Sequence, residues 1–170
     1  KTNLSAFKNP RQDGIYSIGI DEGDELIDVK MTTGDDSLVL VTRSGRAMRF
    51  HENKLRQMGR TARGVIGVKM RDSEDAVVAL NVVDDNAFLL VATENGYGKR
   101  TMHSEYAEKN RGGLGVIAIK ASDRNGPVAS AHTVQEGDAV MMITEKGQIV
   151  RFGVTDTRPM GRATQGVRLL

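Results

Sequence analysis

The sequence repeats with a period of 51 residues, and no other feature constrains the fold as strongly. A first landmark is a glycine followed four residues later by an arginine: Gly45 and Arg49, Gly96 and Arg100, Gly147 and Arg151. A second landmark is an arginine four residues ahead of a Gly-Val pair, at 60–65, 111–116 and 162–167. Because two separate landmarks keep one period, the chain consists of tandem structural repeats.

Each repeat has the pattern of short β-strands. In the best-defined copy, an apolar run at 76–83 ends in an acidic turn, and a second run at 88–92 ends in a turn at 94–96. Residues 97–101 then return as the partner strand of a hairpin. With the alternating run at 65–70, this gives about four strands per repeat, as in a propeller blade. Continuous apolar runs predict strands that neighbouring blades cover on both faces.

The predicted fold class is therefore all-β, with propeller-like blades of antiparallel strands. WD40 and kelch propellers are disfavoured because both depend on Trp, and the chain has none. Connections at 51–63, 102–114 and 153–165 show no apolar period, so each is a functional loop or a crossover. Only 102–109 has room for one helical turn. The predicted repeats are 1–13 (partial), 14–63, 64–114, 115–165 and 166–170 (partial).

Charge is distributed unevenly along the repeat. Residues 43–63 hold seven bases and one acid, and residues 145–168 hold five bases and two acids. By contrast, 21–28 and 72–85 each hold five acids and no base. If the blades stack in register, the bases form a band along one surface and the acidic turns lie elsewhere. Such a band suits phosphate binding, although a solvated face of mixed charge is the simpler alternative.

The recurrence of the basic segments favours phosphate binding over the simpler alternative. The predicted DNA-contacting residues are the basic side chains of the hairpin returns and connections: Arg46, Arg49, Lys54, Arg56, Arg60, Arg63, Lys99, Arg100, Arg111, Arg151, Arg158 and Arg162. Aromatic residues make up only 4% of the chain, so base stacking can contribute little to binding.

No catalytic or cofactor site is visible in the sequence. The segment 96–101 resembles a P-loop, but Thr93 stands where its first glycine belongs, and no helix follows. The three histidines lack metal-ligand spacing, and His51 and His103 are predicted to be surface loop residues. Without cysteine, thiolate metal sites and disulfides are excluded, which fits a reducing compartment. Nothing in the chain has the pattern of a signal sequence or of a membrane span.

Several segments together resemble the C-terminal domain of the bacterial DNA gyrase A protein. They are Met58-Gly59-Arg60 with Gly64-Val65, Asn110 to Val116, Met160 to Val167, and Leu89 to Thr101. The start of the chain, Lys1-Thr2 with Phe7 and Gly14, is also similar. The family's Q-R-R-G-G-K/R-G box is absent, and Asn110 to Gly115 is a degenerate copy of it.

The resemblance implies a β-pinwheel, in which propeller-like blades exchange strands with their neighbours, and here a partial set of blades. It implies that the domain wraps duplex DNA around a basic rim without sequence specificity, which gives gyrase its negative-supercoiling direction. The fragment itself is expected to be non-catalytic, since the catalytic tyrosine lies elsewhere in the gyrase A protein. ATP and Mg²⁺ also act elsewhere in the holoenzyme, so no cofactor is expected here.

The implied partners are duplex DNA, the rest of the gyrase A protein, and the gyrase B protein in an A2B2 holoenzyme. The implied location is the bacterial cytoplasm, at the nucleoid. Two alternatives remain open. One is the C-terminal DNA-binding domain of the corresponding topoisomerase IV protein, which has a similar pinwheel. The other is a propeller module whose basic loops bind an acidic protein.

Overall fold

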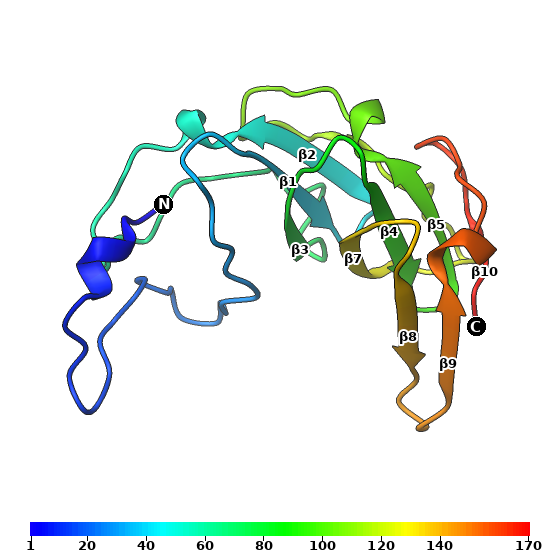
Figure 1. The fold of residues 1–170 in the computed structure, drawn as a ribbon, viewed down its shortest axis with the longest axis horizontal. Helices are drawn as coiled ribbons and strands as arrows, with labels where there is room; N and C mark the ends of the chain where they lie inside the picture. Colours follow the sequence, from blue (N-terminus) through cyan, green and yellow to red (C-terminus); the bar gives the residue numbers. More distant parts are fainter.

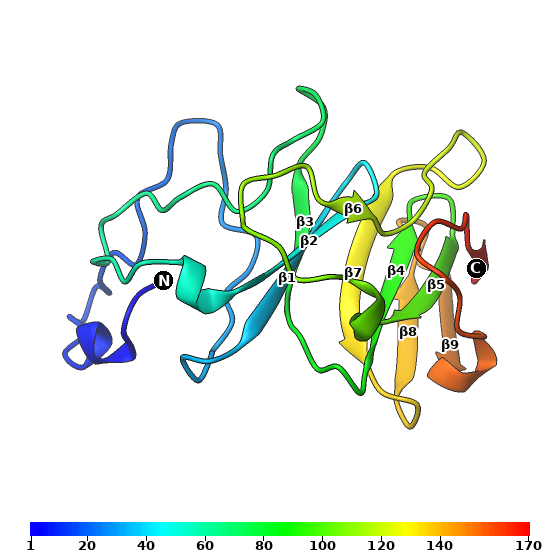
Figure 2. The same cartoon turned by 90° about the horizontal axis from the view of Figure 1, so that it is seen from above.

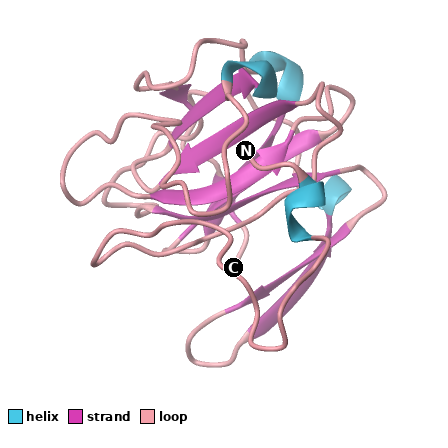
Figure 3. Cartoon of the chain, turned by 90° about the vertical axis from the view of Figure 1, so that its left-hand side faces the viewer, coloured by secondary structure: helices cyan, strands magenta, loops and turns pink.

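The computed structural model describes residues 1–170, which form an arch built almost entirely of strands and loops (Figures 1 and 3). The strands are β1 Ser37–Thr42, β2 Arg46–His51, β3 Val77–Val82, β4 Phe88–Thr93, β5 Tyr97–Met102, β6 Val116–Ile117, β7 Val128–Val134, β8 Ala139–Ile143, β9 Ile149–Gly153 and β10 Val167–Arg168. The helical elements are the 3-10 turns η1 Leu4–Phe7, η2 Glu52–Lys54, η3 His103–Glu105 and η4 Val154–Asp156. None of the helices is long and apolar enough to cross a membrane.

The strands form propeller-like blades, as the repeat predicts. One four-stranded sheet has the order β3-β1-β2-β6, a second has the order β10-β5-β4-β7, and β8 pairs with β9. All these pairings are antiparallel. The hairpins β1–β2, β4–β5 and β8–β9 follow one another along the arch (Figure 2).

Neighbouring blades exchange strands. β6 follows the β4–β5 hairpin in sequence but pairs with β2 of the preceding blade, and β10 follows β8–β9 but pairs with β5. The connections 102–114 and 153–165 are therefore crossovers. The strands that begin at Val116 and Val167 belong to the preceding blade, so a blade does not coincide with the predicted repeat 64–114.

The exchanged strand explains why the second landmark carries glycine. Gly115 and Gly166 adopt positive φ angles of 70° and 78°. A Cβ at Gly115 would lie 2.3 Å from the carbonyl oxygen of Ala47, and one at Gly166 would lie 2.5 Å from that of Gly98. Since Ala47 and Gly98 are equivalent positions of β2 and β5, the same close approach occurs at both exchanges.

Replacing Gly115 with alanine should therefore destabilise the protein substantially. A positive φ and a backbone clash together predict a loss of about 2–4 kcal/mol in the free energy of unfolding. Gly59→Ala is the matched control because Gly59 has no positive φ and no atom within 4 Å of a built Cβ. Urea unfolding of both variants tests this, and equal stabilities would contradict the close approach.

The core lies between blades. β4 is buried at all six positions, which confirms the prediction that continuous apolar runs are covered on both faces. The largest cluster joins Val39 and Val41 of β1, Leu89 and Val91 of β4, and Ala131 of β7. These side chains come from two adjacent sheets, so apolar contact between blades holds the arch together.

The first 33 residues depart from the predicted strand pattern. They contain only η1, and Leu26, Val29 and Met31 are largely exposed. Residues 26–31 are the repeat equivalent of β3, which pairs with a hairpin that precedes it in the chain. In the structure, residues 26–31 pair with no strand.

Candidate nucleic-acid interface

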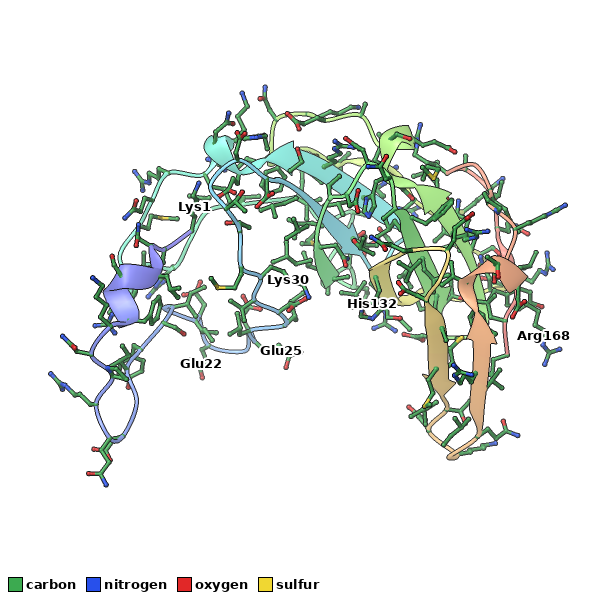
Figure 4. All side chains as sticks on the ribbon, in the orientation of Figure 1. Lys1, Glu22, Glu25, Lys30, His132 and Arg168 are labelled. Atoms are coloured by element: carbon green, nitrogen blue, oxygen red, sulfur yellow. The ribbon has the colours of Figure 1, made fainter.

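The three long connections lie along the convex side of the arch, which we call the outer contour (Figure 1). Within them, Lys54, Arg56 and Arg158 are exposed. The acidic segment 21–28 lies on the concave side, where Figure 4 labels Glu22 and Glu25. Glu22 and Glu25 therefore lie apart from the connections as the charge pattern predicts, but Asp21 at the start of the same segment pairs with Arg63 of the connection 51–63 at 2.7 Å.

The second acidic segment does not follow that prediction, because two of its acids are bonded to the first hairpin. Asp85 accepts hydrogen bonds from the Arg49 guanidinium at 2.7 and 3.2 Å, and that guanidinium keeps the pKa of Asp85 below its usual value. Asp75 accepts bonds of 2.8 Å from the amide and the hydroxyl of Ser44. The acids at 72–85 thus cap and pair the basic hairpin instead of lying apart from it.

The arginine of the first landmark joins neighbouring blades. Arg49 of β2 pairs with Asp85 and donates to the carbonyl of His103 at 3.0 Å. Arg100 of β5 donates to the carbonyl of Thr157 and lies 3.4 Å from Glu136. Asp85 and Glu136 are also 51 residues apart. At Arg49 and Arg100 the repeated arginine therefore has a structural role that does not require DNA.

The arginine of the second landmark holds the backbone near the start of its own predicted repeat. Its guanidinium donates to a carbonyl just after Gly14-Ile15 or a Gly-Val pair: Arg60 to Tyr16 at 2.7 Å, Arg111 to Ile66 at 2.9 Å, and Arg162 to Ile117 of β6 at 3.3 Å. All three arginines are still partly exposed. Arg60 and Arg162 use one guanidinium nitrogen each for these bonds, and Arg111 uses a second, Nε, to the carbonyl of Lys54 at 3.1 Å. The remaining nitrogens are available to a ligand.

Two predicted DNA contacts are not accessible in the structure. Lys99 is fully buried, and its Nζ donates to the carbonyls of Gly161, at 2.6 Å, and of Arg162. Burial lowers the pKa of Lys99 to about 8. Arg100 is 3% exposed and stacks over the Phe88 ring at 4.3 Å. Both side chains are bonded inside the protein, so the prediction that they contact phosphates does not fit this placement.

The remaining predicted residues differ in exposure. Arg151 is exposed, Arg46 is partly exposed at the start of β2, and Arg63 is exposed but paired with Asp21 at 2.7 Å. Lys109 and Lys120 are exposed bases outside the predicted set. Lys109 could have been found from its place in the connection 102–114, whereas Lys120 carries no repeat signal. The amide of Lys120 bonds to the carbonyl of Thr164 in the following connection.

His103 is a buried residue, so its predicted surface position is wrong. Its Nε2 lies 3.0 Å from Thr133 Oγ1, which itself donates to the carbonyl of Val82. Nε2 must therefore carry the proton, and Nδ1 is buried without a partner. Burial, reinforced by the nearby Arg49 guanidinium, lowers the pKa of His103 to about 4 against the weaker opposing effect of Asp85 and Asp84.

This burial predicts a stability loss in mild acid. The unfolded chain binds a proton on His103 below its ordinary pKa, and the folded protein does not, so stability falls as the pH drops from 6.5 towards 4. Between pH 7 and pH 5 the free energy of unfolding should decrease by about 2 kcal/mol. Urea titrations at both pH values measure this. His103→Gln should remove most of the decrease, and an unchanged pH dependence in that variant would contradict the assignment.

The whole chain matches one family model, described as DNA gyrase C-terminal domain, beta-propeller, over residues 1–33, 36–84, 87–135 and 138–170. The chain belongs to this family. The last three matched ranges begin 51 residues apart, and each begins one residue before a hairpin: β1–β2, β4–β5 and β8–β9. The predicted β-pinwheel class is thereby confirmed.

Curated relatives agree with the family match. The DNA gyrase A protein of Chlamydia pneumoniae is 44% identical over 171 residues, covering 100% of this chain and 20% of that protein. The DNA gyrase A protein of Klebsiella oxytoca is 46% identical over 170 residues, covering 100% of this chain and 19% of that protein. The chain thus spans about a fifth of the length of the curated relatives it matches.

Two solved structures share the fold. The C-terminal domain of DNA topoisomerase IV matches with a TM-score of 0.92 and 27% identity, covering 99% of this chain and 53% of that one. A DNA gyrase A C-terminal domain matches with a TM-score of 0.84 and 26% identity, covering 94% of this chain and 54% of that one. The arch therefore corresponds to about half of each solved domain.

Proposed function

We propose that the outer contour binds the phosphates of duplex DNA without sequence preference. The observation that carries this proposal is the position of exposed bases on successive connections of one convex surface, with Glu22 and Glu25 on the opposite side. Arginine and lysine at exposed positions suit phosphate oxygens, and few aromatic side chains are available for base stacking. The proposed contacts are Arg46, Lys54, Arg56, Arg60, Arg63, Arg111, Arg151, Arg158 and Arg162.

DNA that follows a convex surface must bend around it, so the proposal includes wrapping. By its family membership the chain would supply this wrapping to a gyrase-type enzyme, and the sense of the wrap would favour negative supercoils. The chain itself would be non-catalytic and would act with the rest of the gyrase A protein and with the gyrase B protein, as an A2B2 assembly at the nucleoid. The match to the topoisomerase IV domain supports the same DNA-binding role in that enzyme as the second candidate.

Binding of random-sequence duplex DNA at several salt concentrations tests the proposal. Each neutralised phosphate contributes about 0.9 to the slope of log K against log salt, so four or more contacts predict a slope of about −3.6 or steeper. Different duplex sequences should bind equally well. Polyglutamate serves as the competing ligand for the acidic-protein alternative. Tighter binding of polyglutamate than of DNA at equal charge would overturn the DNA-binding proposal.

A further inference from the structure

The connection 153–165 is held by three consecutive side chains of β5, a set that we call the β5 clamp. Lys99 Nζ donates to the carbonyls of Gly161, at 2.6 Å, and of Arg162. Thr101 Oγ1 donates to the carbonyl of Met160 at 2.8 Å, and Arg100 Nε donates to the carbonyl of Thr157. All three residues are at most 3% exposed. The clamp thus fixes the backbone on both sides of Arg158.

The β5 clamp is specific to this blade. The equivalent positions in β2 are Met48, Arg49 and Phe50, so only the arginine is shared. The connections 102–114 and 153–165 share one backbone hydrogen bond. The amide of Lys109 donates to the carbonyl of Arg49, and the amide of Met160 donates to the carbonyl of Arg100, each at 2.9 Å. At β2 the same contact with the next connection therefore forms with apolar side chains in place of the buried ammonium and the buried hydroxyl.

A buried ammonium is an unfavourable way to stabilise a blade. Desolvation of a charge costs several kcal/mol, and the hydrogen bonds of Lys99 to two carbonyls have to offset that cost. What directed bonds to carbonyls add is a single defined conformation of the segment they hold. Between η4 and β10 the held segment forms only an isolated β-bridge, from Pro159 to Arg100, so the side-chain bonds of the β5 clamp add to this backbone contact in setting its conformation.

The segment inside the clamp presents an exposed base. Arg158 follows the clamped Thr157 directly, is exposed on the outer contour, and forms no ion pair with an acid. We infer that Lys99, with Arg100 and Thr101, is a positioning residue that holds Arg158 at a fixed place for a DNA phosphate. This inference rests on the proposed DNA binding and specifies how one of its contacts is set.

The experiment is a double-mutant cycle in the full-length protein that contains this chain. Lys99→Met introduces the residue found at the equivalent position of β2, and Arg158→Ala removes the presented base. Affinity for random-sequence duplex DNA and its salt slope are measured for the parent, both single variants and the double variant. Thermal unfolding is recorded alongside, and binding is measured at a temperature where every variant is folded.

Lys99→Met should weaken binding by about 3- to 10-fold and flatten the salt slope by about 0.9, the contribution of one phosphate contact. In the Arg158→Ala background the same substitution should change affinity by less than about 1.5-fold, because the base it positions is gone. An unchanged slope in Lys99→Met, or an equal loss in both backgrounds, would overturn the inference while leaving DNA binding intact. A parent protein that fails to bind DNA would overturn the proposed function and this inference with it.

Discussion

Replacing Lys54, Arg56 and Arg158 together with glutamate should reduce the affinity for random-sequence duplex DNA by at least about 100-fold. All three are exposed on the outer contour, and none takes part in the blade contacts described above. Losing three phosphate contacts should also flatten the slope of log K against log salt by about 2.7. Fluorescence anisotropy with a labelled duplex at several salt concentrations measures both quantities.

A pair of single variants separates position from net charge. Lys54→Glu and Lys30→Glu make the same change at exposed lysines, but Lys54 lies on the outer contour and Lys30 on the concave side (Figure 4). Lys54→Glu should lower the slope by about 0.9, and Lys30→Glu should leave it unchanged. If both variants lost affinity and slope equally, binding would depend on overall charge and not on the outer contour.

Truncating Arg100 to alanine should lower the free energy of unfolding by about 3–5 kcal/mol. The guanidinium is buried, stacks over Phe88 at 4.3 Å, and donates to the carbonyl of Thr157 from the next connection. Its removal leaves that carbonyl without its donor and opens a cavity beside the Phe88 ring. The loss should be visible in urea unfolding.

Two controls identify which interaction matters. Glu136→Ala removes the acid 3.4 Å from Arg100, but the Glu136 side chain is 68% exposed, so the loss should stay below about 1 kcal/mol. Arg124→Ala removes an exposed arginine over the Tyr97 ring at 4.8 Å, and should also cost less than about 1 kcal/mol. An Arg100→Ala loss no larger than either control would contradict the structural role of the buried guanidinium.

Most of the blade could be predicted from the sequence because its period is strict. The apolar run at 88–92 and the turn at Gly96 predict the β4–β5 hairpin, and the structure contains it. The exchange of β6 to β2 was not predictable from the repeat, since a two-residue strand has no pattern of its own. The length of the connection 102–114 and the resemblance to a β-pinwheel indicate an exchange, and Gly115, whose close approach to Ala47 depends on the partner blade, marks where it occurs.

The DNA contacts were harder to predict, because an arginine can recur every 51 residues either to join blades or to bind a ligand. Arg49 and Arg100 recur as contacts between blades, and Lys99 falls in the same basic segment but inside the protein. Sequence alone cannot separate these from Arg158, since the distinction depends on which side of a strand meets the next connection. Exposure decides it, and exposure comes from the packing of residues far apart in the chain.

Lysine acetylation with and without bound DNA, read by mass spectrometry, tests the outer contour most directly. Lys54 and Lys109 are exposed in the first two connections, Lys30 is exposed on the concave side, and Lys99 is fully buried. DNA should slow the acetylation of Lys54 and Lys109 about 5-fold or more and leave Lys30 unaffected, while Lys99 stays unreactive throughout. Protection of Lys30 with free reaction of Lys54 and Lys109 would contradict binding on the outer contour.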